Sequence, residues 1–517
     1  MLTLAGAASS AERPGKLDWV PVDFSGRIGG LDTASDGRVV VAGDVTHAVG
    51  TSDPSATWVQ AYLPSGALDQ SFGTDGVVGF QGDDRTVVAA AIQPDGRVLV
   101  AESAFGSAQH LVRRLTWDGD PDATFGARGS IQPNHGRYLT DIALQPDGRL
   151  VVIGNTASFP NDHNGVFAAR YLPDGSPDLG FGPGGVVEVG WADGGLGWGD
   201  GGARVALQPD GALILTARQD GVPVIARLLA DGRPDTSLNG GGFSPMEVGR
   251  VAWADRVYRD DLIPPAVVLP DGRIRVGVAF RKGSERELRM ALVGLSADGH
   301  PDLAFGSRGL ALGPVPNVSG PRPSSNPATG ESIMDLVADP RGGILAAGAR
   351  WNGRDALAKL RSGTRRFRPD GSADRSFGDL GIARGALVGN QTALTVHAAF
   401  LGDDRLVLAE DIIHEKSGGG NSSLRALHAG YDEDPPMVSA VVAGCHVLRV
   451  RIRDLSPMDR VVVRAGAKVI ERTNRKRSRV FVRGDGGRRL TVRATDLAGN
   501  SATRRVRLPP CQEASGR

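Results

Sequence analysis

Along most of this chain the hydrophobic residues occur in short β-branched runs, interrupted by Pro, Asp and Gly and without a helical period. One pattern recurs: an apolar run, a turn of the PDG type and a second β-branched run, as in AAIQPDGRVLVAE, IALQPDGRLVVIG and VALQPDGALILTA. Two such runs around a Gly-containing turn predict a β-hairpin. Including weaker copies, the chain has seven such turns, at Asp36, Asp95, Asp147, Asp210, Asp271, Arg341 and Asp404.

A second motif lies between successive hairpins, as in YLPSGALDQSFG, LTWDGDPDATFG and YLPDGSPDLGFG, and a Gly-led run such as GVVGF usually follows it. Each unit therefore predicts four strands. Four-stranded units repeated along a chain are typical of a β-propeller, in which each sheet is buried against its neighbours. We expect an all-β protein whose main domain is a seven-bladed β-propeller of four-stranded blades.

The two ends of the repeat array predict how the ring closes. The seventh unit runs into YDEDPP without a fourth strand, whereas GKLDWVPVDFSG near the N-terminus resembles the end of the second motif followed by a strand. A ring closed in this way leaves no exposed sheet edge between its first and last blades. We predict that residues 19–24 pair with the strand near residues 424–427.

The units LQPDGRLVVIGNT and ARYLPDGSPDLGFGPGGVV resemble the delta-60 repeats of secreted and surface-associated bacterial proteins. The resemblance covers about residues 16–431, and it departs from the motif at Leu238 and Asn239, where FG is expected. It implies a propeller fold and a bacterial, exported protein. It implies no established activity.

After residue 433 the pattern changes to short alternating runs, among them HVLRVRIRD, RVVVRAG and RRLTVRATD. They predict a small C-terminal β-sandwich, and ATDLAGNSATRRVRL resembles the last hairpin of bacterial immunoglobulin-like and fibronectin-type modules. We therefore divide the chain into residues 1–13, a signal-peptide remnant or disordered segment, 14–433, the propeller, 434–512, the immunoglobulin-like sandwich, and 513–517, a tail.

The net charge of +1 conceals a division between the two domains. From residue 436 onward there are 19 Lys plus Arg and 6 Asp plus Glu, so this part carries a charge of +13. The preceding part has 40 Lys plus Arg and 52 Asp plus Glu, so it carries a charge of −12. Such asymmetry points to a polyanionic partner, or to docking of the basic part on the acidic part.

Two features predict export. The start, MLTLAGAASSAERPGK, resembles the end of a secretory signal. Cys445 and Cys511 bracket the C-terminal domain and suit one disulfide, with two unpaired thiols as the alternative. No apolar stretch reaches the roughly 18 residues of a membrane span. We expect a soluble, secreted or cell-surface bacterial protein.

An Asp follows the turn Gly of every second motif and could be read as a metal ligand. A calcium site needs several converging oxygens, whereas each copy offers one or two acids, so we predict that these carboxylates bond their own turns. The nine histidines show no metal-binding spacing, and no nucleophile motif occurs. We expect no metal, no cofactor and no catalytic residue. The six Asp residues are Asp69, Asp122, Asp178, Asp235, Asp302 and Asp374.

Long, dissimilar loops such as GWADGGLGWGDGG and the Pro-rich loop of residues 314–332 fall at the end of the propeller opposite to the tight turns. Loops on a rigid scaffold often carry binding, so we predict that this insertion face contacts a glycan or protein. The alternative for each residue, taken singly, is that it only fills space in its loop and contacts no ligand. The predicted contact residues are Trp191, Trp198, Trp253, Trp351, His163, His414, Asp193 and Asp200.

The run RTNRKRSRVFVRGDGGRR predicts a polyanion-binding surface. Because Phe481 is its only aromatic residue, we expect an anionic cell-envelope polymer rather than a nucleic acid. The alternative is that this basic surface is exposed to solvent or docks on the acidic propeller. The predicted contact residues are Arg472, Arg475, Lys476, Arg477, Arg479, Arg488 and Arg489.

Together these patterns predict a monomeric, non-catalytic binding or adhesion scaffold. The alternative is a polysaccharide lyase or hydrolase with a site at the mouth of the propeller channel. A purely structural role is the third option.

Overall fold

A computed structural model divides the chain into two compact units, which are described separately. One unit, here called the propeller unit, comprises Leu17–Ala373 and Arg384–Leu427, and the other, the C-terminal unit, comprises Met1–Lys16, Asp374–Ala383 and His428–Arg517. The structure describes residues 22–25, 27–45, 56–81, 85–104, 109–136, 138–156, 165–190, 203–219, 222–238, 243–246, 263–280, 288–314, 329–352, 361–378, 381–387, 393–402, 405–413, 420–429, 436–442, 447–453, 458–481, 489–496 and 500–509.

The first half of the propeller unit folds into four-stranded antiparallel sheets in which the strands follow one another in sequence order. The first sheet contains β2 (Arg27–Thr33), β3 (Val39–Val45), β4 (Ala56–Tyr62) and β5 (Val77–Gln81). The second contains β6 (Arg85–Ile92), β7 (Val98–Ala104), β8 (Leu111–Leu115) and β9 (Ser130–Ile131). The third contains β10 (Tyr138–Leu144), β11 (Leu150–Asn155), β12 (Val166–Tyr171) and β13 (Val186–Val189), preceded by the short 3₁₀ helix η1 (Pro183–Gly185). The fourth contains β14 (Ala203–Leu207), β15 (Leu213–Gln219), β16 (Val222–Leu228) and β17 (Ser244–Pro245).

The second half continues the pattern with two departures. The next sheet contains β18 (Ala266–Val268), β19 (Ile274–Phe280), β20 (Arg289–Leu295) and β21 (Leu310–Leu312). A five-stranded sheet follows, with β22 (Thr329–Glu331) and β23 (Asp335–Ala338) both paired to β24 (Ile344–Asn352), then β25 (Arg361–Phe367) and β26 (Ala383–Leu387). The last sheet contains β27 (Ala393–Leu401), β28 (Arg405–Ile413), β29 (Gly420–His428) and, from the start of the chain, β1 (Val22–Ser25).

The PDG turns form the predicted hairpins for a local reason. In the second sheet the N–H of Gly96 donates to the Gln93 carbonyl (2.9 Å), and the Gln93 N–H donates to the Arg97 carbonyl (2.8 Å). Pro94 suits the second position of such a turn, and Gly96 has a φ of 89°, which glycine adopts without strain. The Asp95 carboxylate accepts the Arg97 N–H (3.1 Å), so a side chain of the turn also stabilises its backbone.

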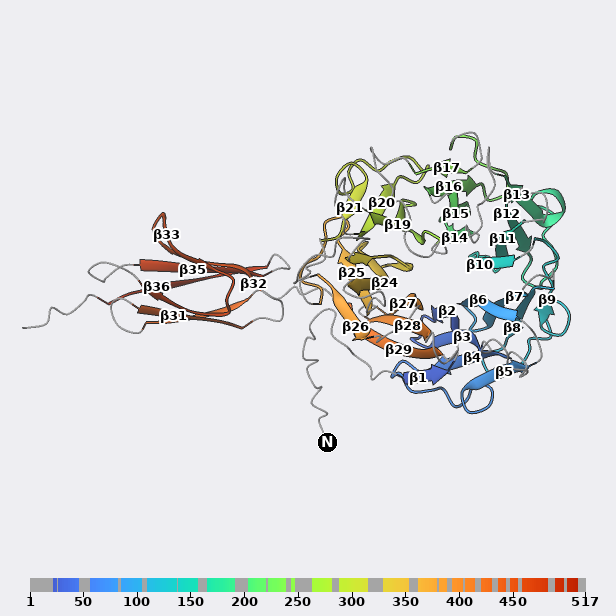
Figure 1. Cartoon of the computed structure of the whole chain (residues 1–517), viewed down its shortest axis with the longest axis horizontal. Coiled ribbons are helices and arrows are strands. Elements are labelled where there is room, and N and C mark those ends of the chain that lie inside the picture. The colour runs from blue at the N-terminus through green and yellow to red at the C-terminus, as the bar shows by residue number, and fades with distance from the viewer. Residues whose placement is uncertain are drawn as a thin grey trace, which may run out of the picture. The chain divides into compact units, whose positions relative to one another are not determined.

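The sheets pack face to face around a common centre, which is the arrangement of a β-propeller (Figure 1). One hydrophobic cluster joins the second and third sheets through residues such as Leu99, Val112, Val152 and Phe167. The first strands of successive sheets contact one another in the order β2, β6, β10, β14, β18, β23 and β27, and β27 also contacts β2. We call these the inner strands.

The last sheet of the propeller unit takes one strand from the start of the chain and shares a hydrophobic core with the first sheet. β1 pairs antiparallel with β29, with Val22 opposite Leu424 and Ser25 opposite Asn421. Trp19, the start of the predicted closing strand, lies outside the described residues. The shared cluster contains residues of β2–β4 such as Ile28 together with residues of β27–β29, so chain segments far apart in sequence are packed together here.

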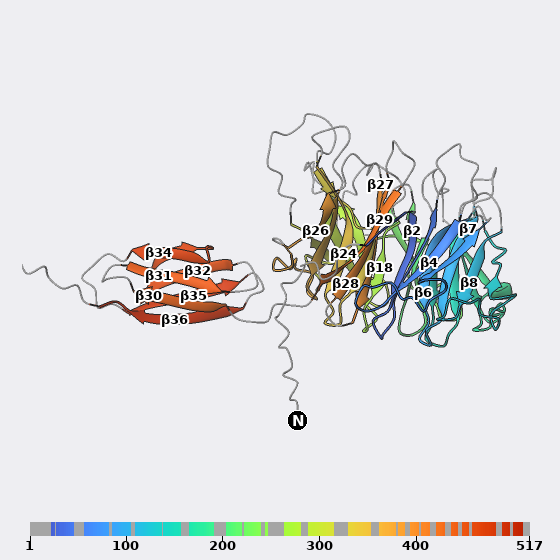
Figure 2. The same cartoon turned by 90° about the horizontal axis from the view of Figure 1, so that it is seen from below.

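The C-terminal unit contains two antiparallel sheets (Figure 2). One has the order β30 (Met437–Val442), β31 (Val447–Arg453) and β34 (Arg477–Phe481). The other has the order β33 (Lys468–Thr473), β32 (Met458–Ala465), β35 (Arg489–Asp496) and β36 (Ser501–Arg507). Alternate residues of both sheets, among them Val450, Val461, Val480 and Val492, form one hydrophobic core.

The turn before β36 is stabilised by Asp496. The N–H of Asn500 donates to the Asp496 carboxylate (2.8 Å), and the Asp496 N–H donates to the Asn500 carbonyl (3.0 Å). Cys445 and Cys511 lie outside the described residues, so the predicted disulfide stays a prediction. Among the described residues there is no helix long and apolar enough to cross a membrane.

Candidate functional site

Most of the predicted insertion-face residues cannot be placed. Trp191, Trp198, Trp253, His163, His414, Asp193 and Asp200 lie outside the described residues. Only the backbone of Trp351 is described; it lies in β24 opposite Gly330 of β22. Part of the loop expected at residues 314–332 is therefore a strand, because β24 is long enough to pair with β22 beyond β23. The binding role of this face stays a prediction.

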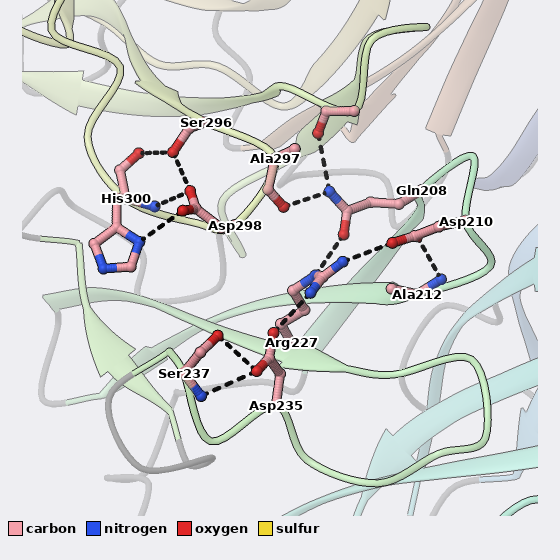
Figure 3. A network of polar contacts seen from close by, with 11 residues as sticks. Gln208, Asp210, Ala212, Arg227, Asp235, Ser237, Ser296, Ala297, Asp298 and His300 are labelled. Atoms are coloured by element: carbon pink, nitrogen blue, oxygen red, sulfur yellow. Dashed lines mark hydrogen bonds and ion pairs between the residues drawn. The ribbon is translucent and has the colours of Figure 1, made fainter.

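The Asp of the second motif bonds its own turn, as predicted. The Asp235 Oδ1 atom accepts the Ser237 N–H (3.0 Å) and hydroxyl (2.7 Å), and its Oδ2 atom lies 2.7 Å from the Arg227 guanidinium (Figure 3). The Ser237 hydroxyl and Arg227 lower the pKa of Asp235 below its ordinary value. Asp69, Asp122, Asp178, Asp302 and Asp374 likewise accept the N–H two residues on.

These turns also connect one sheet to the next. The Gln208 side-chain amide donates to the carbonyls of Gly272 (2.9 Å) and Ala297 (2.8 Å), while its oxygen accepts from Arg227 (2.6 Å) (Figure 3). Arg227 extends the network to Asp210 (2.8 Å). The side chains of Gln208, Arg227 and Asp235 are thus occupied by structural bonds.

The aromatic residue of the second motif is buried beneath an arginine. The Arg170 guanidinium lies 4.5 Å from the ring centroid of Phe181, and Arg275 lies 4.1 Å from that of Phe305. Phe181 is 0% exposed and belongs to a cluster that joins the third and fourth sheets. Its role is therefore to fill the space between blades.

The inner strands carry a set of charged residues that sequence reasoning missed. Four of them lie directly opposite the residue twelve positions later in the chain. The pairs are Asp141 with Ile153, Arg204 with Thr216, Asp335 with Ala347, and His397 with Ala409. They therefore occupy one level of their sheets, here called the charged level. Arg204 and Asp335 form an ion pair at 3.6 Å. Each of the four is the only Asp, Glu, Lys, Arg or His residue of its strand, so only an alignment of the repeats would have shown that they lie at the same level.

The acids of the inner strands tie neighbouring strands together. Asp141 accepts the N–H of Val205 in the next sheet (3.0 Å), and Asp335 accepts that of Ala398 (2.8 Å). Burial raises the pKa of Asp141 to about 6, although Arg204 and backbone donors oppose the shift. Burial, together with nearby arginines, lowers the pKa of His397 to about 4. The level thus combines a weakly acidic carboxyl group with a histidine that stays neutral at physiological pH.

We expect Asp141→Asn to change how the stability of the propeller depends on pH. A folded-state pKa of about 6, above the unfolded value, means that the folded state keeps a proton that the unfolded state loses. Stability from this group therefore falls as pH rises from about 4 to about 6, by up to about 3 kcal/mol. His397 has the opposite sign, because its depressed pKa makes stability fall as pH decreases from about 6.5 towards 4.

Urea unfolding of the wild type and the D141N variant at pH 4 and pH 7 separates the two contributions. The His397 term is common to both proteins and cancels in their difference. The variant should gain about 2 to 3 kcal/mol relative to the wild type between pH 4 and pH 7. A difference that does not change with pH would show that burial does not raise the Asp141 pKa.

The C-terminal unit presents a basic groove on the outer side of the sheet β33-β32-β35-β36. Its volume is about 470 Å³. Strand alternation directs Val461 and Val463 into the core, so the residues between and beside them point outward. Val462 lies between Arg472 and Arg493 on the neighbouring strands. The groove is lined by Arg460, Val462, Arg464, Arg472, Thr491, Arg493, Thr495 and Thr503.

The basic surface extends beyond the groove. Arg505 lies opposite Thr491, and Arg507 lies opposite Arg489, so these arginines share the outer side with the groove. We call the whole surface the groove face. Among the described residues, the only ion pair on this face joins Arg460 to its neighbour Asp459 at 3.8 Å, and both side chains are exposed. Arginine cannot lose its charge, so the face is strongly positive.

The predicted basic run is divided between two surfaces. Arg472 and Arg489 lie on the groove face, whereas Arg477 and Arg479 lie on the other sheet, because the chain changes sheets between β33 and β34. Arg475 lies between these strands, and the Lys476 carbonyl accepts the Ile452 N–H. Arg488 lies outside the described residues.

Sequence reasoning missed the groove arginines that lie outside this run. Arg460, Arg464 and Arg493 come from strands that are distant in sequence but adjacent in the sheet. The signal was the spacing of four positions between Arg residues in RVVVRAG and RRLTVRATD, because residues an even number of positions apart lie on the same side of a strand.

Comparison with known proteins supports the β-propeller fold but does not indicate an activity. A family model described as "Domain of unknown function (DUF5122) beta-propeller" matches residues 93–125 and 145–181, within the second and third sheets. Each segment begins just before a PDG turn and ends at the Phe of an FG motif, Phe125 or Phe181. No curated protein matches the chain.

Solved structures with a similar shape have low sequence identity. A protein of unknown function from Dyadobacter fermentans is 11% identical, with a TM-score of 0.37 over 78% of this chain and 95% of that one. A prolyl oligopeptidase B from Galerina marginata is 10% identical, with a TM-score of 0.37 over 83% of this chain and 55% of that one. An endo-arabinase from Bacteroides thetaiotaomicron is 12% identical, with a TM-score of 0.29 over 56% of this chain and 92% of that one. The family match and the sheets together identify a β-propeller similar to this family of unknown function.

Proposed function

We propose that this protein is a non-catalytic binding scaffold whose C-terminal unit holds an anionic polymer on the groove face. The observation that carries the proposal is the set of four arginines lining one groove, Arg460, Arg464, Arg472 and Arg493, with no acid among the described residues of the lining. Like charges on adjacent strands oppose folding, and a bound polyanion would remove that repulsion.

The side chains of the groove favour a polymer that bears carboxylate, phosphate or sulfate groups. The guanidinium of arginine pairs with such groups through two parallel hydrogen bonds. The hydroxyls of Thr491, Thr495 and Thr503 add neutral partners for sugar hydroxyls or further anionic oxygens. The described part of the groove lining contains no aromatic residue on which a base could stack. We therefore assign an anionic cell-envelope polymer rather than a nucleic acid as the ligand.

For the propeller unit we propose a closed seven-bladed ring. The contact between β27 and β2, the pairing of β1 with β29 and the hydrogen bond from the Thr33 hydroxyl to the Phe400 carbonyl (2.6 Å) support it. In this proposal, the insertion face of the ring contacts a second ligand, a glycan or a protein.

For the C-terminal unit we propose an immunoglobulin-like or fibronectin-type module. The described part of the unit has seven strands in two antiparallel sheets, ordered β30-β31-β34 and β33-β32-β35-β36 around one core, which supports this assignment. A disulfide between Cys445 and Cys511 and export to the bacterial cell surface as a monomer complete the proposal.

Binding of the full-length protein to polygalacturonate, polyphosphate and heparin tests the function of the groove face. Relative to the wild type, the R464S/R493S variant should bind the preferred polymer about 100-fold more weakly, because two charge-assisted contacts are lost. R233S is the matched control, since Arg233 is an exposed propeller arginine paired with Asp231. Equal affinity of R464S/R493S and the wild type for every polymer would contradict the proposal.

The charged level of the propeller favours a second candidate function. Asp141, with a pKa of about 6, and His397 occupy the same level, and a carboxyl group in this range suits general acid–base catalysis. A polysaccharide lyase or hydrolase would release products that D141N and H397N do not release. Release at an undiminished rate by both variants would exclude the charged level as its active site.

A further inference from the structure

The second sheet of the C-terminal unit presents another basic surface, with a different character. Its outward residues, here called the three-stranded face, alternate with the core residues Leu448, Val450, Ile452 and Val480. They are Met437, Ser439, Val441, Val447, Arg449, Arg451, Arg453, Arg477, Arg479 and Phe481.

The arginines of this face lie next to one another. Arg449 is opposite Arg479, and Arg451 is opposite Arg477, so like charges occupy directly opposed positions on adjacent strands. All four are exposed, and none forms an ion pair with a described residue. Opposed like charges destabilise a sheet in water. An anionic partner would offset that cost.

Exposed apolar side chains lie on the same face. Phe481 is 69% exposed, Val441 is 62% exposed and Met437 is 71% exposed. Phe481 lies opposite Val447 at one end of the sheet, and Val441 lies beside Arg449. Met437 lies opposite Arg453 at the other end. The apolar residues therefore flank the arginine pairs, whereas the groove lining has Thr residues and a half-buried Val462.

We propose that the three-stranded face binds the surface of a bilayer that contains anionic lipids. Anionic headgroups attract arginines near the surface, and the boundary with the acyl chains accepts large apolar side chains such as Phe481. A soluble polyanion would neutralise the arginines but leave Phe481, Met437 and Val441 in water. The presence of both kinds of side chain on one face favours the bilayer.

The proposal goes beyond polymer binding, because it concerns the opposite sheet of the same sandwich. One C-terminal unit would then hold a polymer on the groove face and a membrane surface on the three-stranded face. Such a unit would link the two, and the two activities would respond to different substitutions.

Vesicle co-sedimentation of the full-length protein tests the proposal. The probes are phosphatidylcholine vesicles with and without 30% phosphatidylglycerol. The wild type should bind the anionic vesicles at least tenfold better than the neutral ones. R451S/R479S should weaken that binding about 25-fold, since each arginine near an anionic surface contributes about fivefold. F481S should also weaken it, and the F481L variant should retain it.

R464S/R493S on the groove face is the control and should bind vesicles as the wild type does. Because that variant is also the one expected to lose polymer binding, failure of one proposal leaves the other standing. The bilayer proposal is overturned by equal binding to neutral and anionic vesicles, or by equal binding of F481S and the wild type. Phe481-dependent binding of single-stranded nucleic acid without vesicle binding would also overturn it, in favour of a nucleic-acid surface.

Discussion

Replacement of Phe181 by alanine is expected to lower the free energy of unfolding of the propeller unit by about 4 kcal/mol. The ring is 0% exposed, packs in the cluster between the third and fourth sheets and lies beneath Arg170. Truncation would remove apolar contacts with both sheets and leave a cavity that the rigid strands cannot fill. Urea unfolding followed by tryptophan fluorescence measures the change.

Leu179→Ala is the matched control for Phe181. Leu179 lies two residues earlier in the same turn but is 74% exposed, so its loss should change the unfolding free energy by less than about 0.5 kcal/mol. If both substitutions had the same small effect, the packing of Phe181 between the third and fourth sheets would not stabilise the propeller unit.

Arg365→Leu is expected to destabilise the propeller unit by about 3 to 5 kcal/mol. The Arg365 guanidinium donates to both carboxylate oxygens of Glu331, at 2.8 and 2.6 Å, and Glu331 is 0% exposed. Among the described residues, the substitution would leave the buried carboxylate with only the more distant Arg350, at 3.8 Å. Thermal and urea unfolding of the full-length protein measure the loss.

The double variant E331L/R365L tests the cause of that loss. Because it removes both charges, it should recover most of the stability lost in R365L. R233L, at an exposed pair, should change little. A double variant as unstable as R365L would show that packing, rather than the uncompensated charge, determines the effect.

The sheets of the propeller could be predicted because their signals are local. Pro94, Asp95 and Gly96 determine one turn within a few residues, and the same chemistry recurs along the chain. The additional strand β22 was not predicted, because its pairing depends on the length of β24 rather than on a turn signal of its own. The function of Asp235 as a turn acceptor was predicted for the same local reason.

The candidate sites were predicted less well, because they depend on which strands become neighbours. Arg472 and Arg477 are close in sequence but belong to different sheets. Arg464 and Arg493 are distant in sequence but line one groove. Strand pairing within the sandwich was not readable from the alternating pattern alone. The charged level required the register of the inner strands for Asp141 and His397.

The salt dependence of polymer binding tests the central claim most directly. If the four groove arginines each neutralise one anionic group, the logarithm of the association constant should fall with the logarithm of the salt concentration with a slope of about −3. The slope for R464S/R493S should be about half as steep, while R233S should match the wild type. A wild-type slope near zero, or the same slope in R464S/R493S, would contradict the assignment of the groove face as the polymer site.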